Sequence, residues 1–278
     1  MSEPTIKKPR RQRRLKGVSL NVMIPNMLTL LALCAGLTSI RFALNDRWEA
    51  AVLAIAVAAL FDTLDGRVAR ILKGSSKFGA ELDSLSDFVC FGVAPALILY
   101  LWGLENTGRF SWIFVLLMSA CCGMRLARFN TMLEDTDAPP FQVNYFVGVP
   151  APAGAGIALL PIVLSLQFGD TLVRNPVFIS IFMVAVSTLF VSKVPTFSFK
   201  KVKISNQWFL PTMVIFVLLA SGLVSAPWAT LSIILVLYMV SIPISFVRHG
   251  QQTRRYSASH PEAIADKPDQ KNDDAPKP

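Results

Sequence analysis

Eight separate apolar runs, each long enough to cross a bilayer, constrain this chain more than any other feature. A membrane-spanning helix needs about 20 mostly apolar residues. Runs of about that length lie at 26–44, 48–72, 82–102, 110–129, 149–168, 175–192, 207–224 and 228–247. With 53% hydrophobic and only 16% charged residues, the composition argues against a water-soluble protein. The sequence therefore predicts an all-α, polytopic membrane bundle of about eight transmembrane helices.

The charges divide the chain into three parts and give the bundle an orientation. A basic cytoplasmic arm is expected at 1–25, a transmembrane domain at 26–247 and a disordered cytoplasmic tail at 248–278. With the N-terminus inside, 23 of the 27 Lys and Arg residues fall on the cytoplasmic side. We expect an integral protein of a bacterial inner membrane, whose basic arm contacts anionic lipid and no nucleic acid.

Histidine and cysteine usage excludes several chemistries. The two histidines, His249 and His260, lie in or beside the polar tail, so histidine-based nucleophilic or zinc catalysis in the bundle is excluded. The four cysteines all lie in apolar stretches without the paired spacing of metal ligands. They are expected to be reduced packing residues.

Four aspartates lie where a membrane protein should avoid them, near the cytoplasmic ends of two consecutive predicted helices. They are Asp62, Asp65, Asp83 and Asp87. A charge buried in the bilayer costs several kcal/mol unless it is paired or faces a polar cavity. The first pair is spaced by three residues and the second by four, so each pair shares one helix face. Two antiparallel helices would present all four carboxylates to one cavity.

Clustered carboxylates of this kind suit a hard divalent cation. They repel one another unless a cation lies among them, and Mg²⁺ or Mn²⁺ prefers carboxylate oxygens. Two such ions form a clamp for displacement at phosphorus. Gly66 and Gly79 leave space for a bulky ligand, and Arg70 is suited to pair with a phosphate. The structural alternative is that the acids only form ion pairs with Arg67, Arg70 and Lys77.

The same window resembles the signature of the CDP-alcohol phosphotransferase family. It reads Asp62-x2-Asp65-Gly66-x2-Ala69-Arg70-x8-Gly79-x3-Asp83-x3-Asp87. The resemblance implies a membrane enzyme in which an alcohol displaces CMP from a CDP-linked donor. It also implies that Asp62, Asp65 and Asp83 bind a divalent metal, with two ions expected, and that Asp87 joins the metal site and acts as general base. Gly66, Arg70 and Gly79 would line the CDP site, together with Asn26 and Thr29 of the segment 24–29, which borders the nucleotide pocket in many members.

Two later stretches resemble the phosphatidylserine synthase branch of this family. They are 125–130 (Arg-Leu-Ala-Arg-Phe-Asn) and 148–155 (Gly-Val-Pro-Ala-Pro-Ala-Gly-Ala). The resemblance implies CDP-diacylglycerol and serine as substrates and a homodimeric assembly. The serine carboxylate needs a partner, for which Arg125, Arg128 and the weaker Asn130 are candidates. The alternative role of both arginines is the ordinary positive-inside one.

Three other functions stay open from the sequence. The nearest is a sibling transferase that uses glycerol 3-phosphate, inositol or choline. A cation or proton transporter would also use intramembrane acids, but the later helices carry no matching acids and the chain has no obvious inverted repeat. A non-catalytic lipid-binding scaffold would not require all four aspartates.

Overall fold

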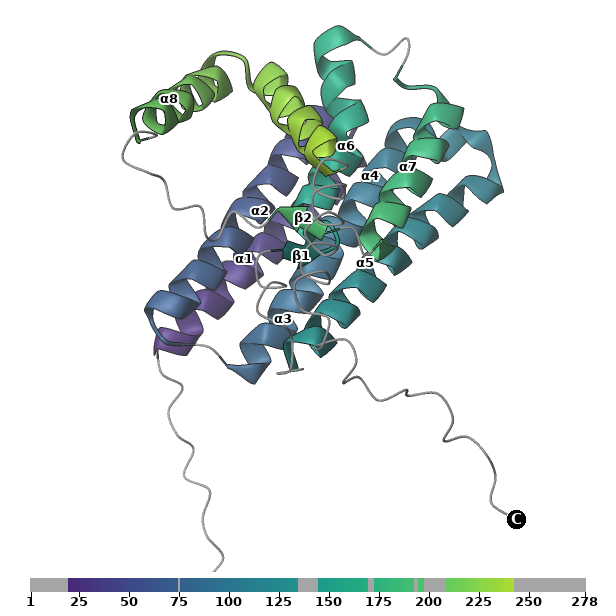
Figure 1. The fold of residues 1–278 in the computed structure, drawn as a ribbon. Coiled ribbons are helices and arrows are strands. Elements are labelled where there is room, and N and C mark those ends of the chain that lie inside the picture. Colours follow the sequence, from purple (N-terminus) through teal and green to yellow (C-terminus); the bar gives the residue numbers. More distant parts are fainter. Residues whose placement is uncertain are drawn as a thin grey trace, which may run out of the picture.

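The computed structural model describes residues 20–74, 76–134, 145–169, 173–192, 195–197 and 209–242, and these are almost entirely helical (Figure 1). The α-helices are α1 (Leu20–Ala43), α2 (Trp48–Ile71), α3 (Lys77–Asp87), α4 (Ala94–Gly103), α5 (Trp112–Glu134), α6 (Ala151–Phe168), α7 (Pro176–Val191), α8 (Phe209–Ser225) and a last helix, Pro227–Ile242. A π-helical turn, η1 (Phe88–Val93), joins α3 to α4, and two 3-10 turns, η2 (Glu105–Thr107) and η3 (Arg109–Ser111), precede α5.

The predicted helical membrane bundle is confirmed. Each of the eight predicted ranges holds helix in its described part, and the third holds α3, η1 and α4 in one continuous run. Four segments are both long and apolar enough to cross a membrane: Leu20–Ala43, Lys77–Gly103, Arg109–Thr131 and Ala151–Phe168. Helix α2 is as long as α1 but is not among these four, because it carries the first two aspartates and two arginines. Eight membrane crossings stay a prediction.

One feature was not predicted, a short antiparallel ribbon of β1 (Tyr145–Val147) and β2 (Pro195–Phe197). Tyr145 pairs with Phe197 and Val147 with Pro195. The two strands are almost fifty residues apart in the chain and each has three residues. No local periodicity signals so short a strand, because its hydrogen-bond partner comes from elsewhere in the fold.

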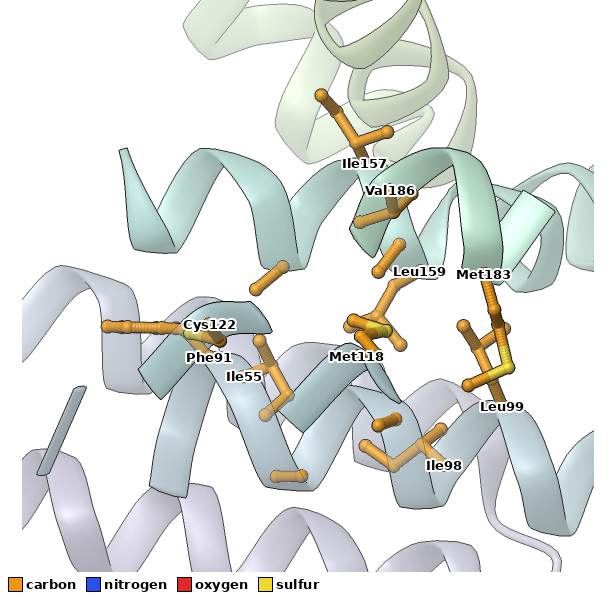
Figure 2. Packing of buried hydrophobic residues seen from close by; sticks show 14 of the residues in the cluster. Ile55, Phe91, Ile98, Leu99, Met118, Cys122, Ile157, Leu159, Met183 and Val186 are labelled. Atoms are coloured by element: carbon orange, nitrogen blue, oxygen red, sulfur yellow. The ribbon is translucent and has the colours of Figure 1, made fainter. Parts of the chain in front are cut away.

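The apolar core lies where α2, η1, α4, α5, α6 and α7 meet. Ile55 of α2, Phe91 of η1 and Met118 of α5 lie in it, with Leu159 of α6 and Met183 of α7 (Figure 2). Most of its members are aliphatic or sulfur-containing side chains, and close packing rather than water exclusion holds such helices together in lipid. The buried cysteines Cys90, Cys121 and Cys122 belong to this core and are unpaired, as the sequence predicted. Cys34 of α1 is also unpaired, but it is exposed and lies outside the core, so the prediction of a packing role is wrong for this residue.

Small residues let the helices of the bundle approach closely. Helix α1 buries Thr29, Ala32, Gly36, Ser39 and Ala43, which are spaced by three or four residues on one face. A side chain at Gly36 would collide with the Sγ of Cys90 in η1. In α6, Gly154 faces the ring of Phe190, and a Cβ at Gly156 would lie 2.8 Å from Leu235. The small-residue stretch at 148–156 therefore packs within the subunit at both of these glycines.

The ends of several helices meet at one end of the bundle. Gly74, in the turn after α2, contacts the backbone carbonyl of Asn21 at the start of α1. The amide of Asn130, near the end of α5, donates a hydrogen bond of 2.9 Å to the hydroxyl of Ser84 in α3. The predicted basic arm before residue 20, the predicted tail and both histidines lie outside the described residues.

Candidate functional site

Two consecutive helices, α2 and α3, position the four aspartates. Asp62 and Asp65 lie near the end of α2, and Asp83 and Asp87 lie on α3. Helix α3 begins where Ser76 caps it, its hydroxyl accepting a 3.0 Å hydrogen bond from the backbone N–H of Gly79. It passes into the π-helical turn directly after Asp87. Such turns insert an extra residue and change the direction of the side chains that follow, often at functional sites.

Three of the four carboxylates come together. One oxygen from each of Asp62, Asp83 and Asp87 lies within 4.8 Å of the others, and all three side chains are half-buried. Asp62 and Asp87 lie within hydrogen-bonding distance of each other. Two carboxylates this close need a shared proton or a cation between them. This acidic cluster has the donor atoms that a hard divalent cation prefers.

Asp65 lies beside this cluster in a different environment. Its side chain is only 5% exposed, and its Oδ2 accepts a hydrogen bond of 2.6 Å from the Thr29 hydroxyl of α1. Asp65 and Asp83 both line the adjacent cavity. We expected all four carboxylates in one cavity. Three of them lie close together, and the fourth, Asp65, lines the cavity with Asp83.

The adjacent cavity has a volume of about 180 Å³ and lies between α1, α2 and the start of α3. Its lining consists of Pro25, Asn26, Thr29, Asp65, Gly66, Ala69, Gly74, Ser76, Gly79, Ala80 and Asp83. Four of the five residues predicted to bind CDP are among these. The fifth, Arg70, is exposed and donates its Nε–H to the carbonyl of Gly66 at 2.9 Å. The guanidinium therefore folds back along α2 toward a residue of the cavity wall.

The two glycines of the motif have different surroundings. A Cβ built on Gly66 would meet no described atom within 4 Å, so this glycine opens directly into the cavity. A Cβ on Gly79 would lie 2.6 Å from the side-chain oxygen of Asn26. Gly66 thus leaves space for a ligand, whereas Gly79 leaves space for a neighbouring helix.

Arg125 brings a buried positive charge to the acidic cluster. It is 9% exposed, and its Nε has no hydrogen-bond partner among the described residues. The guanidinium interacts electrostatically with Asp87 and with Tyr238 of the last helix. A buried guanidinium with a free N–H is suited to bind a carboxylate or phosphate oxygen. No sequence signal connects Tyr238 with the site, because only the tertiary packing brings the last helix there.

The other two acceptor candidates join helices instead. Arg128 donates from its Nη1 and Nη2 to the carbonyls of Val191 and Ser192 at the end of α7, at 2.9 and 3.3 Å. Asn130 is bound to Ser84, which neighbours Asp83. Both interactions fix the end of α5 against neighbouring segments. The segment 193–203 carries four lysines, which would favour a phosphorylated acceptor if they lay near the aspartates. It lies largely outside the described residues.

Comparison with known families identifies this arrangement. The model of the family described as "CDP-alcohol phosphatidyltransferase" matches residues 22–191, which include most of α1, all four aspartates and the cavity. The chain belongs to the CDP-alcohol phosphatidyltransferase family. A second model, "CDP-alcohol phosphatidyltransferase 2", matches residues 207–243, which include α8 and the last helix. The resemblance seen in the aspartate motif is thereby confirmed. This family consists of phosphotransferases, so the chain is an enzyme.

Several relatives of this phosphatidyltransferase carry one name, CDP-diacylglycerol–serine O-phosphatidyltransferase. The protein from Mycobacterium leprae is 41% identical over 263 residues, which cover 95% of this chain and 85% of the relative. That from Mycobacterium bovis is 39% identical over 266 residues, covering 96% and 90%. That from Helicobacter pylori is 34% identical over 222 residues, covering 78% and 88%.

Proposed function

We propose that this phosphatidyltransferase moves the phosphatidyl group of CDP-diacylglycerol to the hydroxyl of L-serine, giving phosphatidylserine and CMP. The observation that carries the proposal is the convergence of Asp62, Asp83 and Asp87 beside the buried guanidinium of Arg125. Relatives that align along most of the chain are named for this reaction.

The acidic cluster is the proposed site of Mg²⁺ or Mn²⁺. When bound there, the metal would neutralise the pyrophosphate and the charge that develops on the departing CMP. We propose two ions, because Asp83 belongs to the cluster and also lines the cavity with Asp65. Asp83 is therefore the carboxylate placed to be shared between two sites.

The cavity is the proposed site of the CDP portion of the donor. Its polar lining residues Asn26, Ser76 and Asp83 surround the open space in front of Gly66. Arg70 lies one turn from Gly66 and is exposed, so its charge is available to a phosphate at the cavity mouth. In this arrangement the pyrophosphate of the donor would lie next to the acidic cluster.

Asp87 is the proposed general base. The serine hydroxyl attacks the phosphorus that bears the diacylglycerol, the new P–O bond forms, and the bond from this phosphorus to the CMP oxygen breaks. Ionised Asp87 takes the hydroxyl proton as the bond forms. CMP leaves with the electron pair of the broken bond, so no covalent enzyme intermediate is needed.

Arg125 is the proposed partner of the serine carboxylate. It is buried, it has a free Nε–H among the described residues, and it interacts with Asp87, the proposed base. A guanidinium binds a planar carboxylate with two parallel hydrogen bonds. Serine held in this way would bring its hydroxyl toward Asp87. Arg128 is not proposed for this role, because two of its N–H groups already bind the end of α7.

The location and assembly are also proposed. With the N-terminus in the cytoplasm of a bacterium, the aspartate end of the bundle faces the cytoplasm, as the distribution of Lys and Arg favours. The polar CDP group can then enter from water while the acyl chains stay in the bilayer. A homodimer in the inner membrane is what the family resemblance implies.

The test is CMP release by the purified protein in detergent. With Mg²⁺ or Mn²⁺ and CDP-diacylglycerol, CMP should appear when serine is added, and D87N should abolish its release. The exposed acid Glu49, at the other end of α2, supplies the matched control. E49Q should keep the activity.

Other acceptors tell the alternatives apart. Release that responds to glycerol 3-phosphate, inositol or choline, and not to serine, would contradict the serine assignment and keep the family reaction. No release with any of these alcohols would contradict the transferase proposal itself.

A further inference from the structure

Thr29 of α1 is bonded to both helices that carry the aspartates. Its hydroxyl donates to Oδ2 of Asp65 in α2 at 2.6 Å. Its backbone carbonyl accepts a hydrogen bond of 3.3 Å from the hydroxyl of Ser86 in α3. Ser86 lies between Asp83 and Asp87, so Thr29 connects the carboxylates of one helix with those of the other.

The bond to Asp65 is the strong one. Thr29 is 4% exposed and Asp65 is 5% exposed, so little water reaches either group. The hydroxyl has one proton and two acceptors in reach, Asp65 at 2.6 Å and the carbonyl of Pro25 at 3.2 Å. A length of about 2.5–2.7 Å is typical of a hydroxyl bound to an ionised carboxylate. The proton therefore belongs to the bond with Asp65.

This bond holds one oxygen of Asp65 against α1. Oδ2 is held by Thr29, while the residue as a whole lines the cavity beside Asp83. A carboxylate held at one oxygen by a buried donor cannot turn away, so its second oxygen keeps one direction. Thr29 was expected to contact CDP, but its only hydroxyl proton is used within the protein.

We propose that Thr29 is a positioning residue for the divalent-metal site, holding Asp65 so that this aspartate can join Asp83 in binding an ion. The inference rests on the metal site of the proposed function. A positioning role and a nucleotide contact for Thr29 have different consequences for metal binding. Loss of the hydroxyl weakens metal binding even when no nucleotide is present.

The experiment measures Mn²⁺ binding to the full-length protein in detergent without substrates, from the electron paramagnetic resonance signal of free Mn²⁺. T29V keeps the shape of the side chain and removes the donor, whereas T29S keeps the donor. T38V is the matched control, because the exposed Thr38 on the same helix donates only to the carbonyl four residues earlier, Cys34. T29A removes the donor with a smaller side chain if T29V does not fold.

T29V or T29A should bind Mn²⁺ about 10- to 100-fold more weakly than the unchanged protein, the usual loss when a residue that holds a ligand is removed. T29S and T38V should bind as the unchanged protein does. Equal Mn²⁺ affinity in T29V, T29A and the unchanged protein would overturn the inference, and a higher KM for CDP-diacylglycerol in these variants would then return Thr29 to the nucleotide. If the unchanged protein binds no Mn²⁺, the metal site itself is wrong.

Discussion

Arg125 and Arg128 lie three residues apart on α5, but their guanidinium groups have different partners. Arg125 is buried and interacts with Asp87, whereas Arg128 donates two hydrogen bonds to the carbonyls that end α7. The sequence motif presents both as equal candidates for the acceptor. Their surroundings therefore differ: Arg128 is used to hold two helices together, whereas the Nε–H of Arg125 has no partner among the described residues.

R125A should raise the KM for serine. A hydrogen bond to a charged group contributes about 1.5–3 kcal/mol, so the KM should increase about 10- to 150-fold. The KM for CDP-diacylglycerol should change much less. R125K should lie between the two, because lysine keeps the charge without the planar fork. Initial rates of CMP release over a range of serine concentrations measure both effects.

R128A should instead lower thermal stability. The two bonds to α7 contribute about 1 kcal/mol each, and a loss of this size lowers Tm by several degrees in a chain of this length. The KM for serine should stay near that of the unchanged protein. A large rise in this KM with R128A, and none with R125A, would mean that the two roles are assigned the wrong way round.

G66A should impair donor binding without disturbing the fold. The added methyl group meets no described atom within 4 Å and enters the cavity. Extra volume in an occupied site costs about 1–3 kcal/mol, so the KM for CDP-diacylglycerol should rise about tenfold. Tm should not fall, because alanine favours the interior of α2 over glycine. G79A is the comparison, since its methyl group would collide with Asn26 and should lower both Tm and activity.

Removal of divalent metal should stop the reaction. Treatment with EDTA should abolish CMP release, and added Mg²⁺ or Mn²⁺ should restore it, because the clustered carboxylates need a cation to hold the pyrophosphate. D62N removes one oxygen ligand and should raise the Mn²⁺ concentration for half-maximal activity by about 100-fold or more. Full activity in excess EDTA would contradict a metal site at these aspartates.

Asn130 and Ser84 should behave as one unit. Because their side chains bind each other, N130A and S84A should lower stability by similar amounts, and the double variant should lose little more. The coupling energy should be about 0.5–1.5 kcal/mol, the contribution of one hydrogen bond. Denaturation of all three variants measures this coupling. A rise in the KM for serine with N130A alone would assign Asn130 to the acceptor instead.

The sequence by itself determined the helical membrane bundle, the approximate positions of its helices and the aspartate motif, although α1 begins at Leu20, six residues before the predicted start, and contains Pro25. These depend on local properties, which are the length of apolar runs and the spacing of residues on one helix face. The boundaries at Trp48, Ile71 and Phe168 lie within one residue of the predicted ones. Asn26, Gly66 and Gly79 are also where the motif places them, around one cavity.

Only the tertiary structure decided which groups at the site are free and which are used in the fold. Spacing of three or four residues puts two side chains on the same helix face but says nothing of what a neighbouring helix presents to them. Thr29 thus turns out to bind Asp65, and Arg128 the end of α7, while the Nε–H of Arg125 has no partner among the described residues. Each difference depends on a hydrogen bond, made or left open, between segments distant in the chain, and helical periodicity carries no information about such bonds.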